Sequence, residues 1–165
     1  MGNPATKKER PRADEAPPAE RVRYEDDLYG WVNQQVALLR AGRLDEIDVE
    51  NVAEELSDVG SSQYDKLWSS LRVLVMHMLR WDQQPEFRTP SWVYSIREQR
   101  KRYAKILKRN PALASRRDEA LADAYESARL WAANGTHLPE DEFPDECPYT
   151  WDDVLNRPFE TDSDR

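Results

Sequence analysis

Cysteine, glycine and long apolar runs are all scarce in this chain of 165 residues. The single cysteine, Cys147, excludes an internal disulfide and a cysteine-cluster metal site. No run approaches 18 apolar residues and no apolar stretch opens the chain, so we expect neither a membrane span nor a secretory signal. Five glycines and few alternating β-branched runs favour helix over sheet. These absences together predict an all-α protein of the reducing cytoplasm.

The motifs that usually carry enzyme chemistry are also missing. The sequence has no Gly-rich phosphate loop, no Gly-x-Ser-x-Gly elbow and no zinc-ligand spacing. Its two histidines, His77 and His137, lie too far apart to form a metal-binding pair on one helix. We therefore assign no catalytic residue, no cofactor and no metal from the sequence.

Charge is abundant but unevenly distributed. Acidic residues outnumber basic ones and leave a net charge of −8, which argues against a general nucleic-acid binder. Residues 95–110 run against this balance with seven Lys or Arg and one Glu, whereas residues 138–165 hold ten acidic residues and two Arg. We expect these opposite charges to attract one another within the molecule. A nucleic-acid interface on the basic face of residues 97–109 stays as an alternative.

Apolar periodicity and capping residues predict four main helices. The first begins after Asp26 or Asp27 and ends at residues 41–43, and the second runs from about 48 to 82 with Asp48 as its cap. The third covers 90–109, and Asn110-Pro111 predicts an immediate start of the fourth, which Gly135 ends.

Aromatic residues punctuate the acidic C-terminal region and predict an extended segment anchored to the helices. Thr150 and Asp153 have the spacing of a capping box, which predicts a short terminal helix. The expected fold is an all-α bundle of four main helices with an extended C-terminal segment and a short terminal helix. We expect a disordered N-terminal arm over 1–23, a helical bundle domain over 24–156 and an acidic tail over 157–165.

Two of the predicted helices carry apolar stripes that we expect to face the core. On the first helix the stripe contains Leu28, Trp31, Val32, Gln35 and Leu39. On the second helix the apolar positions recur every three or four residues from Val49 to Met78, almost without a phase break at Gly60. This continuity predicts one long helix, bent if anywhere at Gly60.

Several segments together resemble a known family. The segments "LRVLVMHMLRW", "SWVYSIREQRKRYAKIL" and "FPDECPYTWDDVL", with the "EEL" segment before them, resemble the bacterial family called domain of unknown function 29, over about residues 24–156. The resemblance implies a bacterial helical bundle. It implies no catalytic residues, because the family's function is unassigned.

Arg100 is the most informative residue of the basic run. On a wheel of 100° per residue it lies about 40° from Ile96, within the apolar stripe of the third helix. A buried arginine needs a partner, so we predict an ion pair with Glu54, or with its neighbour Glu55, that fixes helix register. A site for an anionic ligand and an arginine that extends out to solvent are the alternatives. Arg97 lies to the side of the stripe, where water solvates it.

His77 is the best candidate for a general base, because histidine titrates near neutrality. The structural alternative is a histidine on the helix flank making one hydrogen bond. An enzyme or metal-binding protein would bring His77 together with Glu54 and Glu55. The five candidate polar residues are therefore Glu54, Glu55, His77, Arg97 and Arg100.

The functional hypothesis that these observations favour is a non-enzymatic protein-interaction module, either homo-oligomeric or bound to another protein. The absence of a convergent catalytic set and the segregation of charge motivate it. The alternatives are an enzyme or metal-binding protein that uses Glu54, Glu55 and His77, and a nucleic-acid binder that uses residues 97–109.

Overall fold

The computed structural model describes residues 21–161. All the regular elements in this range are helices, and they confirm the predicted all-α bundle of four main helices. The four are α1 (Leu28–Ala41), α2 (Val49–Gln83), α3 (Pro90–Arg109) and α4 (Arg117–Thr136), and the short terminal helix is α5 (Trp151–Asn156). None of the helices in this range is both long and apolar enough to cross a bilayer.

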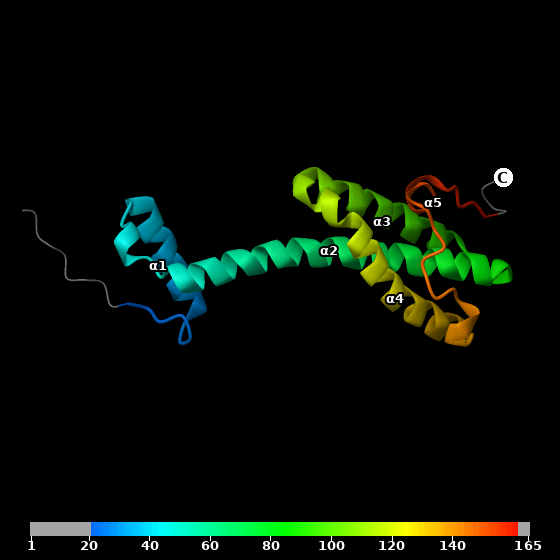
Figure 1. Ribbon diagram of the computed structural model, residues 1–165, viewed down its shortest axis with the longest axis horizontal. Coiled ribbons are helices and arrows are strands. Elements are labelled where there is room, and N and C mark those ends of the chain that lie inside the picture. Colours follow the sequence, from blue (N-terminus) through cyan, green and yellow to red (C-terminus); the bar gives the residue numbers. More distant parts are fainter. Residues whose placement is uncertain (1–20, 162–165) are drawn as a thin grey trace, which may run out of the picture. The chain divides into compact units, whose positions relative to one another are not determined.

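The chain divides into two compact units, residues 1–55 and 56–165. Figure 1 colours the helices of both along the sequence, with α1 in the first unit and α3, α4 and α5 in the second. Most of the arm predicted over residues 1–23 lies outside the described residues. Within the described part of that range, the backbone N–H of Val22 donates to the side chain of Gln34.

In the N-terminal unit, α1 is held to the first turn of α2 by polar contacts around Asp48. The Asp48 carboxylate caps α2 by accepting from the backbone N–H of Asn51, as predicted, and it also accepts from the Trp31 indole at 3.2 Å. The buried Gln35 side chain in turn accepts from the Asp48 backbone N–H at 2.9 Å. Asp27 caps the other end of this arrangement, at the start of α1, and accepts from Gly30 N–H.

The apolar stripe predicted for α1 is divided in two by the structure. Trp31 and Gln35 are buried, whereas Leu28 and Leu39 are each 48% exposed and Val32 is 38% exposed. The start of the α2 stripe is exposed as well, at Val49, Leu56 and Val59. The expectation that these residues face the core of the chain is wrong.

The C-terminal unit contains the main core. The second part of α2 contributes seven buried apolar side chains between Leu67 and Trp81, and α3 adds Trp92, Val93, Ile96, Tyr103 and Ile106. Alanines occupy four successive positions of α4 that are four residues apart, 120, 124, 128 and 132, and all four are fully buried. Such small side chains on one helix face let the α4 backbone approach its neighbours closely.

The boundaries of α4 differ from the prediction at both ends. Pro111 opens a six-residue 3-10 helix, η3 (Pro111–Arg116), before α4 begins. At its other end α4 continues through Gly135 to Thr136, and His137 adopts the left-handed conformation with φ 58°. The Thr136 hydroxyl donates to Ala132 C=O within this last turn. Gly135 therefore does not end the helix.

The C-terminal segment returns from the end of α4 to α5 beside α3 (Figure 1). Phe143, Val154 and Phe159 are buried, so the prediction of an aromatic-anchored segment is confirmed and the anchoring continues past residue 156. The predicted capping box is also present, since Thr150 and Asp153 each accept from the other's backbone N–H. Tyr125 adds a further anchor by donating its hydroxyl proton to Pro144 C=O.

Candidate functional site

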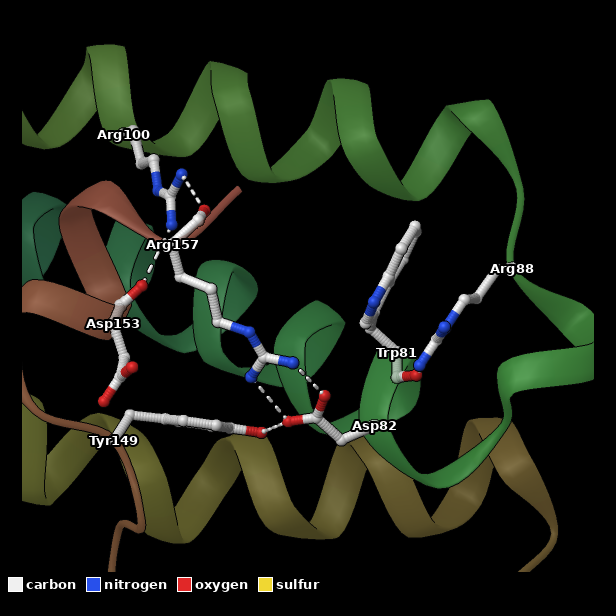
Figure 2. A network of polar contacts seen from close by, with 7 residues as sticks. All are labelled: Trp81, Asp82, Arg88, Arg100, Tyr149, Asp153 and Arg157. Atoms are coloured by element: carbon white, nitrogen blue, oxygen red, sulfur yellow. Dashed lines mark hydrogen bonds and ion pairs between the residues drawn. The ribbon is translucent and has the colours of Figure 1, made fainter. Parts of the chain in front are cut away.

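Arg100 points from α3 into the C-terminal end of α5. Its guanidinium donates to three backbone carbonyls, those of Val154 at 2.8 Å, Arg157 at 2.8 Å and Asp153 at 3.0 Å. The last carbonyls of a helix lack partners within that helix, and here Arg100 supplies them from another helix. Figure 2 shows the side chain of Arg100 reaching toward Arg157 and Asp153.

Desolvation governs the electrostatics of Arg100. Burial lowers the pKa of its guanidinium, and the positive charge of Arg157 lowers this pKa further. The carbonyl dipoles at the end of α5 and the face of the Phe159 ring, 5.3 Å from the guanidinium carbon, offset the cost of that burial. Arg100 therefore holds the terminal helix against α3 without a carboxylate partner.

A second polar contact ties the same segment to the end of α2. Arg157 donates two hydrogen bonds to Asp82, at 2.6 and 2.9 Å, and the Tyr149 hydroxyl donates to the same carboxylate at 2.9 Å (Figure 2). Burial raises the pKa of Tyr149, and the neighbouring negative charge of Asp82 raises it further, so the phenol stays a hydrogen-bond donor. We call Asp82, Arg100, Tyr149 and Arg157 the clasp.

The loop after α2 is held by a related contact. Arg88 donates through Nε to Trp81 C=O at 3.0 Å, and its guanidinium carbon lies 4.7 Å from the centre of the Trp81 ring (Figure 2). The other face of this region is packed by Phe159, whose ring meets Trp81 edge-on at 5.4 Å. The C-terminal segment and the loop after α2 therefore both pack against the Trp81 ring.

The structure corrects the partner that the sequence predicted for Arg100. Arg100 does need an internal partner, but its partners are the backbone carbonyls of α5 and not a carboxylate. Glu54 itself is exposed, in the N-terminal unit. Its half-buried neighbour Glu55 accepts from the Tyr24 hydroxyl at 2.7 Å.

His77 belongs to the other unit and is partly buried on α2. Its Nδ1 is buried without a hydrogen-bond partner in the described part of the chain. Burial lowers the pKa of His77 to about 4, and the nearby Arg80 adds to the effect. Histidine is therefore neutral here at physiological pH, with no carboxylate beside it to raise its basicity.

The described part of the chain contains no cluster of potential metal-binding side chains. Over residues 21–161, no three His, Cys, Asp or Glu side chains lie in a group that could hold a metal ion. Glu54 and Glu55 belong to the N-terminal unit, whereas His77 belongs to the C-terminal unit. Cys147 is half-buried against the core, and burial raises the pKa of its thiol, which makes it a poor nucleophile.

Within residues 21–161, the basic face of α3 has no ion-pair partner. Arg97 is exposed, and neither it nor Lys101 nor Lys105 forms an ion pair within residues 21–161. The acidic side chains after α4 pair elsewhere, since Glu140 and Asp145 both contact Arg129. The expected neutralisation of the basic run by the acidic tail is absent from these contacts.

Sequence reasoning missed the clasp except for one of its members. Arg100 was identified because it interrupts an apolar stripe. Asp82 and Arg157 lie in polar stretches where a charged side chain is ordinary, and no spacing rule connects positions 75 residues apart. Tyr149 carries a second signal, because it is one of the aromatic residues that punctuate the acidic segment.

The fold and the clasp define an all-α protein whose C-terminal segment is fixed to a helical core by arginine contacts. A family model described as domain of unknown function DUF29 matches residues 23–160, and the chain belongs to this family. Searches of the curated proteins and of the solved structures each found no significant match.

Proposed function

We propose that this chain is a non-enzymatic protein-interaction module of the bacterial cytoplasm that self-associates through an exposed apolar face of α1. The observation that carries the proposal is the exposure of four aliphatic side chains on this helix, between 36% and 48% for Leu28, Val32, Val36 and Leu39. We call these four residues the α1 face. Enzyme function receives less support, because the candidate base His77 has a low pKa and no acidic partner.

The α1 face is one continuous surface. At 100° per residue its four members fall within an arc of about 80°, next to the arc that buries Trp31 and Gln35. Residues 28–39 contain no charged side chain, although 34% of the chain is charged. A helix that is apolar on its outer as well as its inner side is normally covered on both. Contiguous apolar exposure of this kind is typical of an interaction surface.

The charges at the two ends of α1 favour a second copy in antiparallel orientation. Asp27 caps the start of the helix, Asp26 precedes it and pairs with Arg23, and Arg40 lies in the last turn. An antiparallel pair of α1 helices places each Arg40 near the acidic residues of the other copy, whereas a parallel pair places like charges together. Such an interface is isologous, with the same surface on both copies, as most dimer interfaces are.

The expected dimer is weak and reversible. Full burial of an aliphatic side chain stabilises by about 1.5–3 kcal/mol, of which roughly half is still to be gained at each of eight side chains. The eight side chains together gain about 6–12 kcal/mol. The middle of that range, less an association cost of about 4 kcal/mol, leaves about 5 kcal/mol, which corresponds to a dissociation constant on the order of 100 µM. Self-association should therefore appear only at high protein concentration.

Sedimentation equilibrium of the full chain tests the proposal. We expect the average mass to rise toward that of a dimer up to about 500 µM protein, five times the expected dissociation constant. The double variant Val32→Glu/Val36→Glu should remain monomeric, because it places charge in the centre of the α1 face. Ala37→Glu is the control, since Ala37 is exposed on the opposite side of α1. A wild-type chain that stays monomeric, or a control that dissociates as fully as the double variant, contradicts the proposal.

A further inference from the structure

A groove of about 450 Å³ lies between α2 and α3 in the C-terminal unit. Its lining includes five cationic side chains, one from α2 and four from α3, and a single carboxylate. The cations are Lys66, Lys101, Arg102, Lys105 and Arg109, and the carboxylate is Glu98. All six side chains are exposed. We call these residues the basic groove.

No acidic side chain of the described residues pairs with the cations of the basic groove. Across residues 21–161, none of its five cations makes an ion pair or a hydrogen bond. The terminal helix α5 packs on a different side of α3, where it contacts Arg100 and Tyr103. The C-terminal segment as far as residue 161 therefore leaves the groove open, and like charges gather there at a repulsive cost that an external anion would remove.

The spacing of the cations suits a row of anionic groups. Lys101, Lys105 and Arg109 recur every four residues, so they advance by about 6 Å per step along one side of α3 and span about 12 Å. One strand of a nucleic-acid duplex carries a phosphate about every 3.4 Å of its axis. The row is therefore long enough to contact about four phosphates of one strand.

The remaining lining favours phosphates over bases or an acidic protein. No aromatic side chain lines the groove, so unpaired bases have no surface on which to stack. The aliphatic residue of the lining, Ile106, is buried and offers no apolar anchor to a protein partner. Lysine and arginine without such neighbours contact the backbone and carry no sequence information.

We propose that the basic groove binds the sugar-phosphate backbone of a nucleic-acid duplex without sequence preference. The overall charge of −8 keeps this binding weak and makes it depend on the local row of cations. The proposal rests on the C-terminal unit and is independent of the α1 face. It adds a second binding activity to the proposed interaction module.

Fluorescence anisotropy with a short labelled DNA duplex tests the proposal on the full chain. Between about 50 and 200 mM KCl, the logarithm of the binding constant should fall with a slope of about −4, close to −0.9 for each cation that contacts a phosphate. Lys101→Gln/Lys105→Gln should make this slope shallower by about 2. If wild type and variant bind equally at 1 M salt, this difference in slope makes the variant's affinity roughly sixtyfold weaker than that of the wild type at 0.1 M salt.

Arg21→Gln/Arg40→Gln is the matched control. It removes the same charge at two exposed positions of the N-terminal unit, away from the basic face of α3, and the salt slope should stay unchanged. Circular dichroism of both variants serves to check that they are folded. The proposal is overturned if the wild-type chain does not bind the duplex at 50 mM KCl, or if the two double variants change the slope equally. Binding of poly-glutamate in place of the duplex also overturns it and indicates an acidic protein ligand.

Discussion

Replacing Arg100 by alanine should destabilise the C-terminal unit by about 3 kcal/mol. The change removes three charge-assisted hydrogen bonds, of 2.8, 2.8 and 3.0 Å, and leaves carbonyls at the end of α5 without their partner. Each such bond contributes about 1.5–3 kcal/mol when fully shielded. Three such bonds sum to about 4.5–9 kcal/mol. Because water reaches part of this guanidinium, the expected loss is smaller than that sum, about 3 kcal/mol.

Urea denaturation followed by tryptophan fluorescence measures this loss. Five of the six tryptophans lie in the C-terminal unit, so the signal reports mainly on that unit. The melting temperature should fall by about 6–12 °C for 3 kcal/mol in a chain of this size. Arg100→Lys keeps the charge but not the planar fork of donors, and it should lose about half as much.

Arg97→Ala serves as the control for this prediction. Arg97 is exposed on the same helix and forms no ion pair within residues 21–161, so its loss should change stability by less than about 0.5 kcal/mol. If Arg100→Ala is as stable as this control, the contacts of Arg100 with α5 do not fix the C-terminal segment and the reasoning is refuted.

Two further predictions concern the same unit. Asp82→Asn should lower the free energy of unfolding by about 1–2 kcal/mol, because it removes the negative charge to which Arg157 and Tyr149 both donate. The same variant should be cleaved faster by proteases after residue 145. Unfolding and cleavage that match the wild-type chain would contradict this role. His77 has a folded pKa of about 4, below its ordinary value of 6.5, so the unfolded chain takes up the proton first and stability falls as the pH drops from about 6.5 to 4. With partial exposure this loss is about 1–2 kcal/mol, and His77→Gln should abolish it; urea titrations at pH 7 and pH 4 that give equal losses for both proteins would contradict the assignment.

The positions of the helices could be predicted because local signals decide them. Asp27, Asp48 and the Thr150–Asp153 capping box each act within a few residues of the chain, and each lies where the pattern predicts. The boundary errors also have local causes. The helix α4 ends after Thr136 because His137, and not Gly135, takes the left-handed conformation that glycine usually supplies.

The candidate site could be predicted only in part, because its contacts join distant segments. The apolar stripe of α3 identified Arg100 as an inward arginine, but backbone carbonyls are present at every residue and leave no sequence signal. Acidic side chains can be identified in a sequence, and for that reason the partner predicted for Arg100 was Glu54. For the α1 face the apolar pattern is visible in the sequence, but periodicity does not indicate whether the chain's own core or another molecule covers that face.

Disulfide formation between single-cysteine variants tests the central claim, that a second copy covers the α1 face, most directly. In a Cys147→Ser background, an antiparallel pair places residue 32 of one copy opposite residue 36 of the other. We predict that a mixture of Val32→Cys and Val36→Cys chains forms the mixed disulfide faster than either chain forms its own. Cross-linking no faster than that of an Ala37→Cys control, or a preference for each chain's own disulfide, would contradict the antiparallel pair.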